Sequence, residues 1–279
     1  MVNLLPALVP AVIWALSAIY YRVFQRNVDF LTLNFMRASL ASLTLLLPAF
    51  YFGLGQGLGF AVVSGVITLA VGDSLFFLAI REIGASIAAP VTYTYVLFVQ
   101  FTASSVGESI PFANFVSAGL ILVGVLILSR TGGGTPRLRG IAIALGGSVA
   151  WTVGNELIKV AANAGGSTFG VAFVRDTSAA LALASVVLLR SARGGWPRPH
   201  LKPREIVAIA IVSIGDLALG STLYVYSIST AGIALTVILT SISPFLTQVF
   251  AKLLGKESPT NKDVFGGLLI VAALIIAVL

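Results

Sequence analysis

Apolar stretches long enough to cross a lipid bilayer recur along the whole sequence and decide what the chain can fold into. A helix needs about 20 mostly apolar residues to cross the hydrocarbon core of a bilayer. Polar residues, glycines and prolines divide the sequence into ten such stretches, at residues 4–25, 30–52, 57–80, 84–105, 111–129, 139–162, 167–190, 204–227, 232–253 and 262–279. Charged residues make up only 10% of the 279 residues, too few to cover the surface of a soluble domain. The sequence therefore predicts an all-α polytopic membrane protein with ten transmembrane helices.

Most of the basic residues gather in connectors that face one side of the predicted membrane. The connectors after the odd-numbered stretches hold Arg22, Arg26, Arg81, Arg130, Arg137, Arg139, Arg190, Arg193, Arg198, Lys202, Arg204, Lys252, Lys256 and Lys262. Because cytoplasmic loops carry an excess of Lys and Arg, we expect a multi-pass protein of the plasma membrane with both termini outside the cytoplasm. The net charge of +7 then indicates contact with the anionic lipids of the inner leaflet and no nucleic-acid partner.

The two halves of the sequence carry the same residues at matching places. The pairs are Trp14 with Trp151, Arg37 with Arg175, Gly72 with Gly220, Gly84 with Gly232, Gln100 with Gln248, Glu108 with Glu257 (after a shift of one residue) and Gly119 with Gly267. We expect one repeat at residues 1–130, a cytoplasmic linker at 131–138 and a second repeat at 139–279. Each repeat has five predicted spans, so the second enters the membrane with opposite polarity. The sequence therefore predicts two inverted five-helix repeats, an arrangement typical of carriers that rock around a midplane site.

Several short motifs resemble those of EamA-type transporters in the drug/metabolite transporter superfamily. The run Val12-Ile13-Trp14-Ala15-Leu16-Ser17 resembles the Trp-Gly pattern of the first helix, although Ala15 stands where the family has glycine. Arg37-Ala-Ser-Leu-Ala41 is similar to the Arg-x-x-x-Ala pattern of the second helix, and Gly107-Glu108 to the end of the fourth. The resemblance covers both halves. It implies secondary transport of small metabolites, often the export of amino acids, with no universal substrate or coupling ion.

Six Arg, Asp and Glu residues fall well inside the predicted spans, away from their ends: Arg37, Asp73, Glu156, Arg175, Asp176 and Asp216. Each charge at a helix centre costs about 2.5–3.5 kcal/mol, so such residues indicate a transport pathway or a structural pair. Asp73 and Asp216 each follow a glycine, and the repeat alignment puts Ser221 opposite Asp73. We expect these two carboxyl groups to bind a proton or a substrate ammonium. The alternative is that they are hydrogen bonded and only hold two helices together.

The remaining ionisable residues lie nearer the ends of their spans. Arg37 and Arg175 are about 10 Å from the interface at 1.5 Å per residue, where a guanidinium reaches headgroups, connector carbonyls or substrate. We expect both to act in gating or structure. Glu156 and Lys159 share a helix face, and we expect them to form an outer ion-pair cluster with Asp176.

Proline and hydroxyl residues interrupt the fourth and ninth predicted spans, around Pro90 and Pro244. Interrupted helices in corresponding spans of inverted halves are the best sequence indication of a carrier's binding site. The candidate substrate-binding residues are Trp14, Asp73, Phe77, Tyr93, Tyr95, Trp151, Asn155, Asp216, Tyr224 and Ser243, and the candidates for coupling or gating are Asp73, Asp216, Arg37 and Arg175. Such an aromatic cavity suits an apolar or aromatic amino acid, or a cation.

Motifs for enzymatic chemistry are missing from the sequence. It has no phosphate-binding Gly-Lys-Ser/Thr loop, no cysteine and one histidine, His200, so we expect no cofactor, no metal and no catalytic residues. The sequence thus favours a secondary transporter that exports a small metabolite, foremost an amino acid, by alternating access with the proton as the candidate coupling ion. The alternatives are a drug or lipid-headgroup translocator, a passive channel, and an integral-membrane lipid-modifying enzyme, which would need clustered catalytic side chains at one interface.

Overall fold

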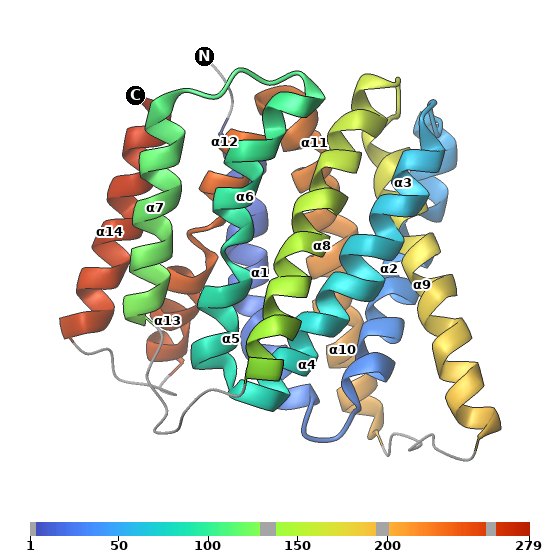
Figure 1. The fold of residues 1–279 in the computed structure, drawn as a ribbon. Coiled ribbons are helices and arrows are strands. Elements are labelled where there is room, and N and C mark those ends of the chain that lie inside the picture. Colours follow the sequence, from blue (N-terminus) through green and yellow to red (C-terminus); the bar gives the residue numbers. More distant parts are fainter. Residues whose placement is uncertain (1–3, 129–137, 194–200, 255–260) are drawn as a thin grey trace.

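The computed structural model describes residues 4–128, 138–193, 201–254 and 261–279, which fold into a helical bundle (Figure 1). The first repeat comprises α1 (Leu5–Phe24), α2 (Phe30–Phe52), α3 (Leu58–Gly65), η1 (Val66–Gly72), α4 (Asp73–Ile83), α5 (Ala85–Thr92), α6 (Tyr95–Thr102), η2 (Ala103–Val106) and α7 (Phe112–Leu128). The second comprises α8 (Leu138–Asn163), α9 (Thr168–Ala192), α10 (Pro203–Ser213), η3 (Ile214–Ser221), α11 (Thr222–Ala231), α12 (Ile233–Thr240), α13 (Ser243–Leu253) and α14 (Asn261–Val278). Each predicted span coincides with one helix or with consecutive helices, so the all-α membrane fold is confirmed.

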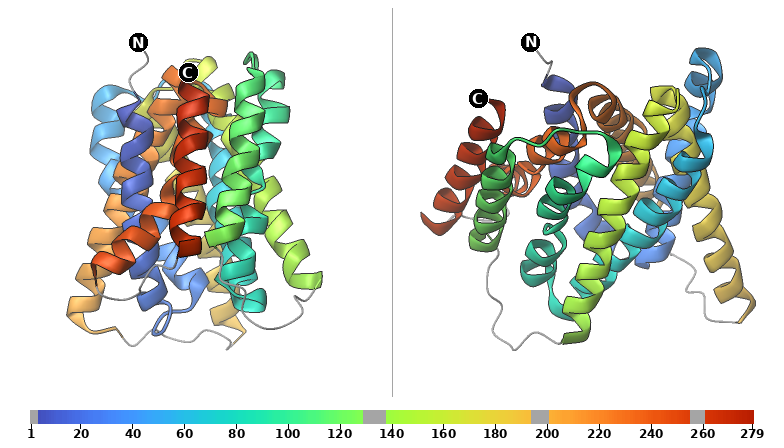
Figure 2. Two further views of the ribbon diagram at one scale, coloured as in Figure 1. Left: turned by 90° about the vertical axis from the view of Figure 1, so that its left-hand side faces the viewer. Right: turned by 45° about the horizontal axis from the view of Figure 1, so that its top comes forward.

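Seven continuous helical stretches of the described chain are long and apolar enough to cross a membrane. They are Leu5–Phe24, Phe30–Phe52, Leu58–Ile83, Leu138–Asn163, Thr168–Ala192, Pro203–Ala231 and Ile233–Leu253. Two shorter apolar helices, Phe112–Leu128 and Val264–Val278, lie side by side as α7 and α14 at one edge of the bundle (Figures 1 and 2). The predicted fourth span, at residues 84–105, is divided into α5, α6 and the short η2, which together cover most of it.

The two repeats run in opposite directions through the bundle. α1 starts at the end where both termini lie, whereas α8 starts at the other end (Figure 1). The connectors of the two repeats meet at the termini end, where the backbone of Gln56 donates to the carbonyl of Gly165 at 2.9 Å and that of Ser167 donates to Leu54 at 3.3 Å. Gly55, in this pairing, has a φ of +73°, and a Cβ there would collide with the backbone of Gly165. This contact fixes the two repeats to each other.

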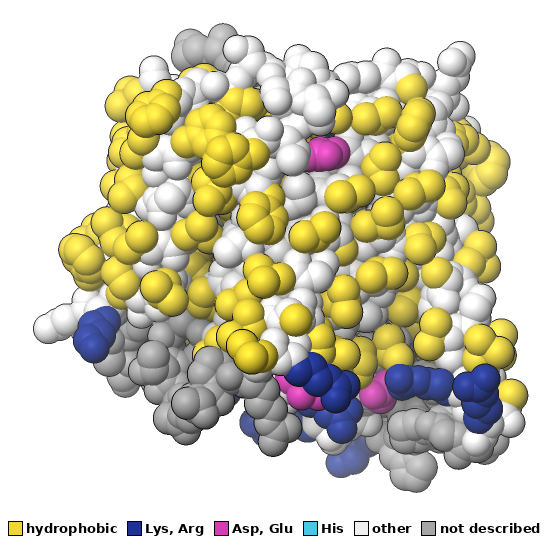
Figure 3. Space-filling model, in the orientation of Figure 1, with side chains coloured by type: hydrophobic (Ala, Val, Ile, Leu, Met, Phe, Trp, Pro, Cys, Tyr) yellow, Lys and Arg dark blue, Asp and Glu magenta, His cyan; other side chains and the backbone are white. Residues whose placement is uncertain are grey.

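Charge divides the bundle surface into an apolar body and one basic end. Apolar side chains cover the body in the face that Figure 3 shows, and Lys and Arg side chains line its lower edge. Arg22, Arg81 and Arg190 occupy the last turns of α1, α4 and α9, all of which end opposite the termini. The described connectors therefore keep the charge separation that the sequence predicted; we call this side the cationic end and the opposite side the termini end.

Two of the long helical stretches contain a π-helical segment at equivalent places in the two repeats. η1 lies between α3 and α4, and η3 lies between α10 and α11. A π-helix replaces i→i+4 hydrogen bonds by i→i+5 bonds, is rare, and occurs frequently at functional sites. Asp73 follows η1 directly, and Asp216 lies within η3. Both carboxylates are therefore attached to widened helix segments inside the bundle.

Helix breaks also occur where the sequence predicts them. α5 contains Pro90 and ends at Thr92, so that Tyr93 and Thr94 separate it from α6. In the second repeat, Ser241 and Ile242 separate α12 from α13, in which Pro244 is one of the first residues. The loss of a backbone donor at proline accounts for both breaks, and the predicted interruptions are confirmed.

Candidate functional site

The centre of the candidate site is a buried ion-pair cluster around Arg37, which lies on α2 and is 5% exposed. Its Nη2 and Nε donate to Oδ2 of Asp216 at 2.7 and 3.1 Å, and its Nη1 lies 3.4 Å from Oδ2 of Asp73. Arg37 and Asp73 belong to the first repeat, whereas Asp216 belongs to the second. One guanidinium therefore joins carboxylates from both halves of the chain, although these residues are far apart in the sequence.

Neighbouring polar groups hold this cluster in place. The hydroxyl of Tyr21 donates to Oδ2 of Asp216 at 2.8 Å, and Oδ1 of Asn34 accepts from Nη1 of Arg37 at 3.1 Å. The Tyr21 ring also lies beneath the guanidinium, with 4.6 Å between Cζ of Arg37 and the ring centroid. Charged groups inside a low-dielectric bundle need this degree of compensation, because their desolvation is costly.

The two tryptophans that align between the repeats contact the two widened helix segments. Trp151 of α8 donates from Nε1 to Oδ1 of Asp73 at 3.0 Å, and Trp14 of α1 donates to the backbone carbonyl of Asp216 at 3.2 Å. A Cβ at Gly72 would lie 2.6 Å from Trp151, and one at Gly220 would lie 3.0 Å from Trp14. Because glycine has no side chain, Gly72 and Gly220 leave room for the indole rings of Trp151 and Trp14. Each repeat therefore packs its tryptophan against the other repeat.

Arg175 occupies the equivalent place in the second repeat but has different partners. It is 2% exposed, and its Nε and Nη1 donate to the hydroxyls of Ser64 at 3.0 Å and Ser221 at 2.9 Å. Ser221 stands where the first repeat has Asp73. Of the two arginines at equivalent places in the repeats, Arg37 is paired with carboxylates, whereas Arg175 is hydrogen bonded to hydroxyl groups. Both guanidinium groups are buried among the helices in this conformation.

Aromatic side chains line the same region. Trp14 and Tyr224 have ring centroids 5.1 Å apart, and Tyr95 lies 5.4 Å from Trp151 and 5.8 Å from Tyr93. Phe77 lies near Arg37, with 5.7 Å between its ring centroid and Cζ of the arginine. The structure therefore brings together most of the predicted substrate-binding residues.

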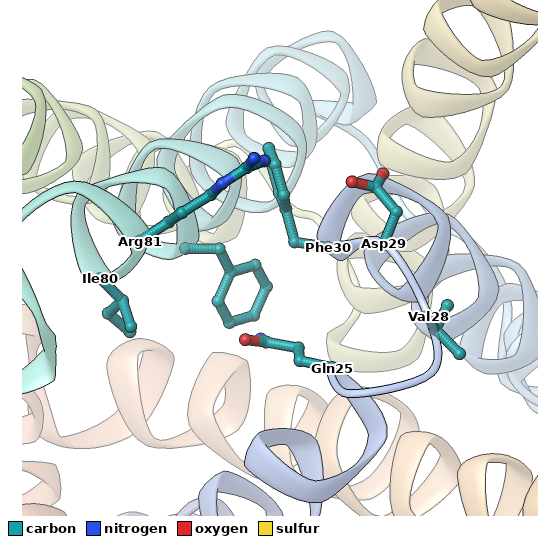
Figure 4. Close-up of a pocket in the computed structure, with 7 residues that line it drawn as sticks. Gln25, Val28, Asp29, Phe30, Ile80 and Arg81 are labelled. Carbon is teal, nitrogen blue, oxygen red and sulfur yellow. The ribbon is translucent and has the colours of Figure 1, made fainter. Parts of the chain in front are cut away.

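A pocket of about 330 Å³ lies at the cationic end, between the connector from α1 to α2 and the last turns of α4 (Figure 4). Its lining residues are Gln25, Val28, Asp29, Phe30, Phe77, Ile80 and Arg81. Phe77 lines the pocket and also lies next to Arg37, so the pocket shares one aromatic residue with the surroundings of the buried ion pairs. In Figure 4 the side chain of Gln25, from the end of α1, points into the pocket.

Two of the candidate substrate-binding residues, Asn155 and Ser243, belong neither to the ion-pair cluster nor to the aromatic side chains around it. Asn155 is 4% exposed on α8, one helical turn from Trp151. The hydroxyl of Ser243 lies 2.8 Å from the carbonyl oxygen of Thr240 and 3.1 Å from that of Ala11, which brings α13 next to α1. Ser243 therefore makes a helix–helix contact in this conformation.

The termini end is closed by a contact between the repeats that sequence reasoning missed. Glu108, which follows η2, accepts from the backbone N–H groups of Ile233 at 2.6 Å and Ala234 at 3.1 Å, at the start of α12. Lys159 lies 3.5 Å from the same carboxylate. The expected cluster of Glu156, Lys159 and Asp176 is therefore wrong, because Lys159 pairs across helices with Glu108. The alignment of Glu108 with Glu257 was the available signal, but it did not identify the partner.

Tyr21 and Asn34 are the other site residues that sequence reasoning missed. Asn34 precedes Arg37 by three residues, which places both on one face of α2. Tyr21 directly precedes Arg22 in the sequence, and nothing in this local pattern indicates a contact with Asp216. Within the described ranges, no group of three or more His, Asp and Glu side chains is arranged to hold a metal ion.

Comparisons with known proteins agree with this architecture. The profile of the EamA-like transporter family matches residues 2–130 and 138–279. An "Uncharacterized transporter" of Archaeoglobus fulgidus is 28% identical over 139 residues, which cover 47% of this chain and 50% of that protein, so the match spans about half the length of this curated relative. A solved crystal structure with 18% identity aligns with a TM-score of 0.83 over 98% of this chain and 95% of its own, which supports the fold alone. Because the family profile covers nearly the whole sequence, the chain belongs to the EamA-like transporter family, within the drug/metabolite transporter superfamily.

Proposed function

We propose that this transporter is a secondary carrier that exports a zwitterionic amino acid by alternating access. The observation that supports this most directly is the sharing of the Arg37 guanidinium between Asp73 and Asp216. A substrate with a carboxylate and an ammonium group can exchange partners with such a cluster. Its carboxylate would take the place of an aspartate on Arg37, and its ammonium would pair with the released aspartate.

The surroundings of the cluster support a substrate with an apolar side chain. The aromatic rings of Trp14, Tyr95, Trp151 and Tyr224 lie around it, and aromatic contacts of this kind bind apolar groups and cations. The pocket at the cationic end gives a route from that side to Phe77. At the termini end, Glu108 joins the first repeat to α12 of the second. The conformation is thus one that loads from the cationic end, as an exporter requires if that end is cytoplasmic.

Counterflow in proteoliposomes tests the substrate class. Vesicles that contain the purified protein and an unlabelled mixture of apolar and aromatic amino acids are expected to take up radiolabelled leucine or phenylalanine by exchange. The matching amino-acid amides, which lack the carboxylate, and the matching 2-hydroxy acids, which lack the ammonium, are expected to exchange at least about tenfold more slowly. Each analogue leaves one buried charge without a partner, which costs about 2–5 kcal/mol.

Vesicles without protein measure the background in this experiment. Equal exchange of the amino acid and its two analogues would contradict recognition of a zwitterion. Absence of exchange with any of the apolar and aromatic amino acids would contradict the substrate class. Uptake that does not depend on an internal pool would indicate a channel.

We further propose that the cationic end faces the cytoplasm of a cell whose plasma membrane holds the protein. The support is the excess of Lys and Arg at that end, since such residues are retained on the cytoplasmic side. The sequence has no cysteine, so single cysteines report on one position each. In intact cells, a membrane-impermeant maleimide is expected to label Gln56→Cys at the termini end. It is expected to label Arg26→Cys at the cationic end only after permeabilisation.

Both of these positions are exposed in connectors, so differences in labelling report on sidedness. The parent protein, which lacks cysteine, is the control for background labelling. Labelling of Arg26→Cys but not of Gln56→Cys in intact cells would reverse the proposed orientation.

A further inference from the structure

Asp176 is a buried carboxyl group that the ion-pair cluster does not use. It lies on α9 and is 0% exposed. Neither of its carboxyl oxygens has a hydrogen-bond partner among the described residues. Asp73 and Asp216, by contrast, both contact Arg37. An ionised carboxylate without a partner inside a membrane bundle is far more costly than a neutral carboxyl group.

The adjacent arginine does not neutralise Asp176. Neighbouring residues on a helix point about 100° apart, so Arg175 and Asp176 project from different faces of α9. The guanidinium of Arg175 instead donates to Ser64 and Ser221. Arg175 is therefore directed at hydroxyl groups, while the carboxyl group beside it is left without a donor.

The charges around Asp176 already balance without it. The ionisable groups on the elements that pack against α9 are Arg37 and Tyr51 on α2, Asp216 on η3, Tyr224 and Tyr226 on α11, and Arg139, Glu156 and Lys159 on α8, with Asp73 directly after η1 and Arg175 and Arg190 on α9 itself. The four that act on Asp176 from the centre of the bundle are Arg175, Arg37, Asp216 and Asp73. These are two cations and two carboxylates, so a neutral Asp176 makes the buried cluster neutral and an ionised one leaves an excess negative charge.

We propose that Asp176 is a proton-binding site, protonated in this conformation, and that its proton is the one coupled to transport. This inference rests on the proposed carrier function and names a coupling residue other than the ion-paired Asp73 and Asp216. When the bundle changes conformation, the O–H bond of Asp176 breaks and the proton passes to water that enters the opened site. The carboxylate that remains is then solvated by the water that enters.

Infrared spectroscopy of the purified protein in lipid vesicles tests this proposal without a substrate. The wild-type protein is expected to show, at neutral pH, the carbonyl stretching band of a protonated carboxylic acid in an apolar environment. Asp176→Asn is expected to lose the whole of this band. Asp73→Asn is the matched control and is expected to keep it, because Asp73 is ion-paired with Arg37.

Isotope labelling keeps the test decisive even if the Asp176→Asn variant does not fold. Wild-type protein is produced in cells supplied with aspartate that carries ¹³C in its side-chain carboxyl group. In this labelled protein, the band is expected to lie at a lower frequency. A band that stays in Asp176→Asn, that is absent from the wild-type protein, or that does not respond to labelled aspartate would overturn the proposal. Failure of amino-acid counterflow with the band assigned to Asp176 would reject the substrate class while leaving the proton site supported.

Discussion

Replacement of Arg37 by methionine is expected to lower the free energy of unfolding by about 3–5 kcal/mol, the cost of removing one partner from a buried ion pair. Methionine has an unbranched apolar side chain that fills part of the space of the arginine, but it leaves Asp216 without its cationic partner. Asp216 is only 4% exposed. Asp73 loses its contact with the same guanidinium. The measurement is an equilibrium unfolding titration in mild detergent, with a denaturing detergent as the titrant.

The repeat supplies a matched control for this substitution. Arg175→Met removes a buried guanidinium of the same kind, but its contacts are the hydroxyls of Ser64 and Ser221, so a smaller loss of about 1–3 kcal/mol is expected. Arg139→Gln, which changes an exposed cation, is expected to alter stability by less than about 0.5 kcal/mol. If Arg37→Met were no less stable than Arg175→Met, the central role of the Arg37 cluster would be contradicted.

A second substitution in the Arg37→Met background separates charge from packing. Asp216→Asn removes the carboxylate that Arg37→Met leaves unpaired, so the double variant is expected to recover part of the lost stability. Additive losses from the two substitutions would indicate that the residues act independently, against the 2.7 Å contact between them.

The fold could be predicted from the sequence because the bilayer imposes a length on each span. The helix breaks near Pro90 and Pro244 were predictable from the local sequence, since proline removes a backbone donor wherever it lies in a helix. The tryptophans, arginines and glycines at matching places indicated the repeat. They also indicated which residues would be structurally equivalent, as the contacts of Trp14 with Gly220 and of Trp151 with Gly72 show.

The partners within the site could not be predicted, because they depend on which spans are neighbours. Asp73 and Asp216 were chosen for their depth in the membrane, yet nothing in their local sequence indicated that Arg37 joins them. The sequence also gave no reason to divide the span of Asp216 into α-helical and π-helical parts. For Lys159, a partner on the same helix was expected by spacing, but tertiary packing brings Glu108 closer.

Glu108→Ala is expected to shift the protein towards a conformation that is open at the termini end. In the structure, this carboxylate accepts from two backbone N–H groups at the start of α12 and lies 3.5 Å from Nζ of Lys159. A hydrogen bond to a charged group contributes about 1.5–3 kcal/mol, so the loss of both is expected to change the ratio of open to closed forms by at least about 100-fold. Lys159→Gln removes only the longer contact and is expected to have a smaller effect.

A cysteine one turn deeper than this contact measures the shift. Ser227 is 1% exposed, and its hydroxyl lies 2.9 Å from that of Thr236 on α12, so Ser227→Cys is shielded while the termini end is closed. Labelling by a membrane-impermeant maleimide added at the termini end is expected to be at least about 100-fold faster in the Glu108→Ala background. Glu82→Ala, at the cationic end of α4, is the matched control and is expected to leave the rate unchanged. Equal rates with and without Glu108 would show that this carboxylate does not hold the termini end closed, and α12 would then need another contact to keep the two repeats together there.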